Sequence, residues 1–246
     1  MIQGLDLIIS LLAVFVGATV MGTVSFGLAL VVAPVLLIFL EPHSVVIIAN
    51  LLIVILLTMV FVKVRRHLQM SKLYGMLSGG LCAVPIGVFA LKIANPSILR
   101  ILIGILILTL GFSLLFKSEI PLAKFKRSGF FFGFIGSLSI TALSIGGPVA
   151  AAYVIAQKQS PDSMRASLSF FFITTYAFAF ILYFFTGLID IESVINTAVL
   201  VPGLIAGFLV ANLIVNRINA STFRYIAIGL ILIGGTVLLL REILRL

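Results

Sequence analysis

The chain alternates long apolar runs without charges and short segments that carry the charges, which gives eight uncharged runs when histidine is counted as charged. A membrane-spanning helix needs about 20 consecutive apolar residues, and six of the runs have this length. The six runs occupy 44–62, 73–91, 101–116, 166–189, 193–216 and 225–240. The pattern therefore predicts an all-α polytopic membrane protein.

The other two runs, 7–40 and 128–157, are too long for single spans. Their 34 and 30 residues would form straight helices of roughly 51 and 45 Å, whereas the hydrocarbon core of a bilayer is about 30 Å thick. Glycine, serine and threonine interrupt both runs near the middle, at 22–27 and 137–148. We therefore expect each run to form a helical hairpin.

The second arms of these hairpins, about 28–40 and 147–157, are short for a membrane span. This favours re-entrant hairpins whose tips lie inside the membrane, where protein must satisfy the backbone polar groups at the break. Two short, tilted spans and a broken single crossing are the alternatives that the sequence leaves open.

The distribution of Lys and Arg supports the hairpins, because cytoplasmic loops of membrane proteins carry an excess of positive charge. With two hairpins, 12 of the 16 Lys and Arg residues fall on one side and 4 on the other; with two single crossings the split is 10 against 6. The poorer side then holds Lys92, Arg100, Arg241 and Arg245. We expect a multi-pass plasma-membrane protein with both termini outside.

An internal repeat divides the chain. An offset of 119 residues aligns five pairs of identical Gly, Ser or Pro residues, the types that mark helix breaks and ends. The pairs are Gly17 and Gly136, Ser25 and Ser144, Gly27 and Gly146, Pro42 and Pro161, and Ser44 and Ser163. An offset of 124 brings 95–100 onto 219–224. We predict two halves, 1–124 and 125–246, each a hairpin followed by three spans, with the second half inverted. An ordinary bundle whose glycines allow close packing is the alternative.

Composition narrows the classes of function. With 62% hydrophobic and 9% charged residues, the chain has almost nothing left for a domain outside the membrane. The net charge of +9 comes from Lys and Arg in short loops between apolar runs, where they set the orientation of the chain in the membrane. We therefore expect no nucleic-acid partner. Cys82 is the only cysteine, and the two histidines stand alone at loop positions, so we expect no metal site and no cofactor. The first apolar run is too long for a signal peptide and is interpreted as retained structure.

The hairpin breaks are the candidate binding site, because a helix that begins inside the membrane directs unpaired N–H groups and a positive dipole end at its ligand. In the second break, Ser144 has the chemistry of an N-cap, Gly146 and Gly147 permit a tight turn, and Pro148 suits the first helical turn. Two such ends that face each other would bind a small anion without a buried Lys or Arg.

Other polar residues could complete the site. In the first half, Ser25 and Gly27 offer a weaker version of the same break, although both break serines could instead bond their own helices. Asn50 and Ser169 are equivalent under the 119-residue offset, follow the hairpins, and could add donors or pack within the bundle.

Four further residues have two interpretations each. Tyr153 could donate a phenolic hydrogen bond or anchor the chain at the interface, and Arg165 could steer an anion or mark the cytoplasmic side. Glu41 and Asp162 could couple protons, but their positions at loop edges favour solvated surface charges.

The hairpin segments resemble the TauE/SafE sulfite-exporter family of membrane permeases. The resemblance rests on 27–34 followed by Pro42 in the first half, and on 144–148 followed by Pro161 and 165–166 in the second. The first half has Ser25-Phe26-Gly27-Leu28 where a triple-glycine pattern is commoner in the family. The resemblance implies transport of small anions, either sulfur-containing anions or organic acids, and often out of the cell.

The leading hypothesis is a secondary transporter, an exporter of sulfite or an organosulfonate, with the anion bound between the two hairpins and a coupling ion or the membrane potential as driving force. An anion channel is the closer alternative, since re-entrant hairpins also build selectivity filters. An intramembrane enzyme is the remoter one, because a catalytic cavity needs clustered nucleophiles, bases or acids. We therefore expect no catalytic residues; the anion and the lipid bilayer are the expected partners, and a homo-oligomer is left open.

Overall fold

The computed structural model describes residues 2–115, 128–214, 236 and 240, and every regular element within them is helical. The predicted span 225–240 and the matched segment 219–224 lie almost entirely outside the described residues. The elements are α1 (Gly4–Val24), α2 (Leu28–Phe39), α3 (Pro42–Val64), η1 (Arg65–His67), η2 (Met70–Lys72), α4 (Tyr74–Ile93), α5 (Pro96–Leu115), α6 (Ser128–Leu143), α7 (Gly147–Ala156), α8 (Pro161–Thr186) and α9 (Ile191–Ile214).

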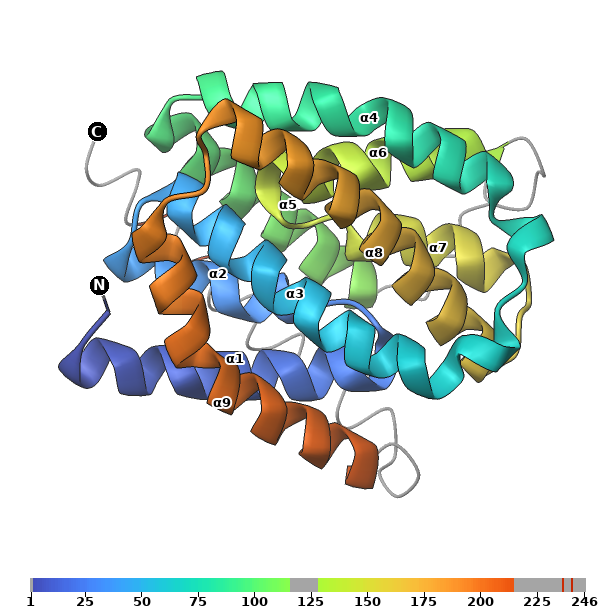
Figure 1. The fold of residues 1–246 in the computed structure, drawn as a ribbon, viewed down its shortest axis with the longest axis horizontal. Helices are drawn as coiled ribbons and strands as arrows, with labels where there is room; N and C mark the ends of the chain where they lie inside the picture. The colour runs from blue at the N-terminus through green and yellow to red at the C-terminus, as the bar shows by residue number, and fades with distance from the viewer. Residues whose placement is uncertain (1, 116–127, 215–235, 237–239, 241–246) are drawn as a thin grey trace.

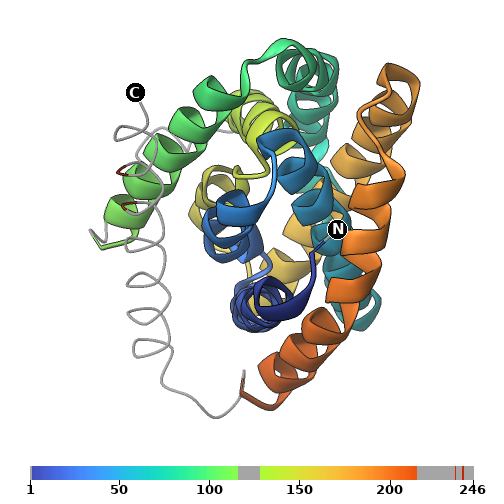
Figure 2. The same cartoon turned by 90° about the vertical axis from the view of Figure 1, so that its left-hand side faces the viewer.

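The all-α membrane class predicted from the sequence is confirmed. Five of the described helices are long and apolar enough to cross a membrane: 4–23, 42–67, 74–93, 161–186 and 191–213. Seen from one end, the two hairpins occupy the middle of the bundle, with α5 on one side and α8 and α9 on the other (Figure 2). In agreement with this central position, nine of the 12 residues of α2 are buried.

Both long apolar runs form helical hairpins, α1 with α2 and α6 with α7. The second arms have 12 and 10 residues, or about 18 and 15 Å, which is too short to cross a hydrocarbon core of about 30 Å. In Figure 1 the first hairpin begins and ends at the left of the bundle, and the second begins and ends at the right. The second arms therefore have the length expected of re-entrant hairpins, and the two hairpins enter the bundle from opposite sides.

Each hairpin packs against a long helix from the other half of the chain. The most extensive helix contacts are those of α6 with α4 and of α1 with α9. The offset of 119 residues carries α1 onto α6 and α4 onto α9, so these two contacts are equivalent under the repeat. This is the arrangement that a two-fold relation between the halves would give; the inverted relation itself stays a prediction.

Glycine allows the backbones of α4 and α6 to touch. A Cβ added at Gly79 would lie 2.0 Å from the carbonyl oxygen of Phe130, and one added at Gly133 would lie 2.0 Å from that of Met76. The obstacles are main-chain atoms, which cannot rotate away. Small residues at such positions are typical of membrane helices that associate through close packing.

We expect the Gly79→Ala substitution to lower the free energy of unfolding in detergent by about 1–3 kcal/mol, the usual cost of overpacking a tight contact. Gly75→Ala, one turn earlier on the same helix, is the matched control, because its Cβ would meet nothing closer than 3.6 Å. Loss of helical circular dichroism on heating measures both. Equal stability of the two variants would show that α4 and α6 do not pack this closely.

Candidate functional site

The two hairpin breaks have the same backbone geometry. Ser25 ends α1 and Ser144 ends α6, with φ angles of 64° and 62° in the left-handed region. Their N–H groups donate to the carbonyls of Met21 and Ile140, at 2.7 and 2.8 Å. All four positions are related by the 119-residue offset, so the two helices end in the same way.

A short second helix starts after each break. Gly27, with a φ of 106°, is the N-cap of α2, and Gly146 is the N-cap of α7; no side chain of the described residues caps either helix. Pro148 lies in the first turn of α7, as predicted. The two helix N-termini leave N–H groups without intrahelical partners next to the breaks, which favours negative charge there.

The expectation that Ser144 caps α7 is wrong. Gly146 is the N-cap, and the hydroxyl of Ser144 donates instead to Oδ1 of Asn50 on α3, at 2.7 Å. The left-handed backbone of Ser144 ends α6 two residues before α7 can be capped, and the buried amide of Asn50 offers a nearby acceptor.

The Asn50 amide links Ser144 to a longer chain of hydrogen bonds. Its Nδ2 donates to the hydroxyl of Tyr183 on α8, at 3.3 Å. Tyr183 in turn donates to the carbonyl of Thr141 in the last turn of α6, at 2.5 Å. Asn50 and Tyr183 are fully buried and Ser144 is 4% exposed. The network therefore fastens the second break to α3 and α8 in a low-dielectric interior, where hydrogen bonds are strong.

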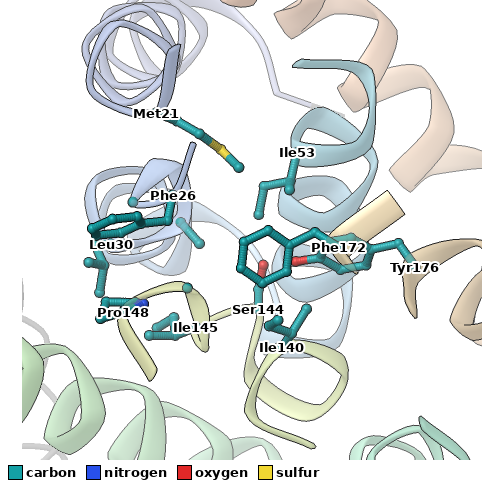
Figure 3. A pocket seen from close by; sticks show the side chains of 13 residues that line it. Met21, Phe26, Leu30, Ile53, Ile140, Ser144, Ile145, Pro148, Phe172 and Tyr176 are labelled. Carbon is teal, nitrogen blue, oxygen red and sulfur yellow. The ribbon is translucent and has the colours of Figure 1, made fainter. Parts of the chain in front are cut away.

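A small cavity lies between the two breaks (Figure 3). Its volume is about 20 Å³, which is room for about one water molecule. Its lining is mostly apolar, and the hydroxyls of Ser144 and Tyr176 point toward each other on one side (Figure 3). Gly147 brings the hairpins together, since a Cβ there would lie 2.6 Å from that of Phe26.

The cavity lining follows the internal repeat. Eight of the lining residues form four pairs at the 119-residue offset: Met21 with Ile140, Phe26 with Ile145, Ala29 with Pro148, and Ile53 with Phe172. Equivalent residues that surround one cavity are what an axis between two related halves would produce. Gly27 and Gly147 also line it.

Arg165 reaches the first break. Its Nη2 donates to the carbonyl of Gly22, in the last turn of α1, at 2.9 Å, and its side chain is only 11% exposed. Gly22 is the counterpart of Thr141, so the ends of both α1 and α6 are capped by a side chain from α8. A positive guanidinium stabilises the negative end of a helix. Neither of the two predicted roles for Arg165 included this contact.

The remaining predicted residues lie as follows. Ser25 and Ser169 are completely buried. Tyr153 is buried between α6 and α7, where its ring stacks on Phe132 with centroids 6.0 Å apart, and it does not line the cavity. Glu41 lies 3.5 Å from Arg100 with 68% of its side chain exposed, in agreement with a surface charge.

Asp162, 54% exposed, is 3.9 Å from Nη1 of Arg165, and its exposure likewise fits a surface charge.

Tyr176 and Tyr183 were not among the site residues predicted from the sequence. Both lie on α8 with Ser169, at a spacing of seven residues, which places them close to one face of the helix. The sequence signal that could have identified them is this repetition of a polar residue every two turns in an otherwise apolar helix.

Comparison with known proteins agrees with the resemblance noted above. The sequence model of the family described as "Sulfite exporter TauE/SafE" matches residues 9–238, nearly the whole chain. No curated protein and no solved structure matches the chain significantly.

Proposed function

Because the chain belongs to the sulfite exporter TauE/SafE family of membrane transporters, we propose that it is a secondary transporter that exports sulfite or an organosulfonate. The anion binds between the two hairpin breaks near the middle of the membrane. The observation that carries this proposal is that the N-termini of α2 and α7, which no described side chain caps, lie beside one cavity. Such ends attract an anion through N–H groups and helix dipoles.

The cavity of about 20 Å³ supports a carrier rather than an open channel. Sulfite has four non-hydrogen atoms and does not fit where about one water does. The hairpins must therefore move apart to admit the ion and close again behind it. Closure around the substrate, followed by opening to the other side, is how a carrier alternates its access.

The family determines the class of activity, and the residues of the breaks refine it. In this proposal the N–H groups of α2 and α7 bind the anion, with Gly27, Gly146 and Gly147 allowing close backbone approach. Asn50 and Ser144 hold the second break in place through their hydrogen bond. In a secondary transporter the driving force is an ion gradient or the membrane potential, and no chemical reaction such as nucleotide hydrolysis takes part.

We expect the purified protein to be stabilised by sulfite and by organosulfonates, because a ligand that binds only the native state raises its free energy of unfolding. At a ligand concentration of 100 times Kd the increase is about 2.7 kcal/mol. The chain has no tryptophan, so unfolding is followed by circular dichroism across sulfite, methanesulfonate, sulfate and acetate at equal ionic strength. Equal stability in all four salts would contradict a binding site for sulfur anions.

A further inference from the structure

Three buried hydrogen-bond donors near the first break have no partner within the described part of the chain. They are the hydroxyls of Ser25 and Ser169 and the Nε of Arg165. Both serines are completely buried. Native proteins leave few buried polar groups unpaired, and each one calls for an explanation.

All three donors belong to residues at one contact or one helical turn from it. Nη2 of Arg165 touches the carbonyl of Gly22 at 2.9 Å, which fixes the side of α8 that faces the end of α1. Ser25 follows Gly22 by three residues, and Ser169 follows Arg165 by four, so each serine is one helical turn from that contact. Residues four apart also share a face of a helix.

The second break shows how the first is arranged. Positions 50 and 169, and positions 144 and 25, are equivalent under the 119-residue offset, and Asn50 accepts a hydrogen bond from Ser144 at 2.7 Å. The repeat therefore predicts that Ser169 faces Ser25 as Asn50 faces Ser144. Because serine lacks the amide group of asparagine, this arrangement would separate the two hydroxyls by about the size of that group.

The chemistry of the gap selects an anion. Arg165 is a cation with donors only, and the serine hydroxyls can each donate one hydrogen bond. The N-terminus of α2, capped by Gly27 without a side-chain bond, adds positive potential on the same side. Charge-assisted hydrogen bonds to an anion would satisfy all three donors, whereas a metal cation would meet the guanidinium.

We propose that Ser25, Ser169 and Arg165 form an oxyanion subsite at the first break, which binds the three oxygens of a sulfite or sulfonate group. The proposal rests on the proposed function and refines it: the two breaks do not share the anion equally. The first break coordinates it with side chains as well as backbone, whereas the second break, whose Ser144 and Asn50 side chains already bond each other, offers only the N–H groups of α7. A carboxylate holds its two oxygens in one plane and cannot direct a separate oxygen at each donor, as the pyramidal sulfite or sulfonate group can, so it binds more weakly.

The sharpest test is Ser169→Asn, which places in the first break the amide that the second break already has. Asparagine would fill the gap and accept from Ser25, so the variant should unfold at the same temperature as the wild type or higher. Its affinity for sulfite should fall at least about tenfold, the effect of losing one hydrogen bond to a charged group. Arg165→Lys, which keeps the charge but lacks Nε, should also bind sulfite more weakly.

Ser10→Ala is the matched control. Within the described residues, Ser10 is also buried on α1 without a partner for its hydroxyl, but it lies 15 residues before Ser25, or about 22 Å along the helix. This variant should keep wild-type affinity for sulfite, methanesulfonate and acetate, each titrated by isothermal calorimetry.

Wild-type affinity for sulfite in both Ser169→Asn and Arg165→Lys would overturn the subsite and leave the proposed function standing. If the wild type itself binds neither sulfite nor methanesulfonate, the proposed function fails, and the subsite with it. Weaker sulfite binding in both variants, with stability retained in Ser169→Asn and the Ser10 control unchanged, is the result that the subsite predicts.

Discussion

Replacement of Ser144 by asparagine will reduce sulfite transport in proteoliposomes to the level of liposomes without protein. The cavity between the breaks has a volume of about 20 Å³, and the added amide group occupies it where Ser144 lines it. Asparagine tolerates the left-handed backbone at this position, so the fold should survive the change. The expected loss of transport follows from the blocked site together with the loss of the Ser144 hydroxyl bond to Asn50, and the amount of protein in the membrane should not change.

Ser71→Asn provides the control for this substitution. Ser71 is exposed in the short 3-10 helix η2, far along the chain from either break. Its substitution repeats the serine-to-asparagine change outside the bundle core. It should transport at the wild-type rate. Transport by Ser144→Asn at that same rate would show that the anion does not pass between the two hairpins.

Asn50→Leu will destabilise the protein by about 1–3 kcal/mol and slow transport. Leucine is close to asparagine in size but neither accepts from Ser144 nor donates to Tyr183, so two buried hydrogen bonds are lost together. Single hydrogen bonds between membrane helices are worth about 0.6 kcal/mol on average and up to about 1.7. The second break loses its attachment to α3, which is why transport is expected to fall as well as stability.

The coupling between Asn50 and Tyr183 is measured by a double-mutant cycle with Tyr183→Phe, in which the two losses should not add. Thr186→Val is the control on α8, because the hydrogen bonds of the Thr186 hydroxyl to described residues all go to carbonyls of its own helix. Additive effects of Asn50→Leu and Tyr183→Phe would mean that the polar chain does not act as one unit.

The hairpins could be predicted from sequence because two independent local signals coincide there. A run of 34 uncharged residues exceeds the membrane thickness, and glycine and serine mark the break within it. The predicted second arms, 28–40 and 147–157, end within one residue of α2 and α7. Both signals act within the run itself, so no knowledge of distant contacts was needed.

The connections of the site could not be predicted in the same way. Ser144 was assigned to the nearest helix start because capping is local, but its partner Asn50 lies 94 residues away. Likewise, the contact of Arg165 with Gly22 joins positions 143 residues apart. A composition or spacing rule carries no information on which helices meet. The exception is the internal repeat, which pairs positions across the chain and whose pairs line the cavity.

The most direct test of the central claim is uptake of radiolabelled sulfite into proteoliposomes that hold the purified wild-type protein, under nitrogen to prevent oxidation. Transport between the hairpins predicts a rate that saturates with sulfite concentration, is inhibited by methanesulfonate, and disappears in Ser144→Asn. A rate equal to that of liposomes without protein, or a saturable rate that Ser144→Asn leaves unchanged, would contradict it.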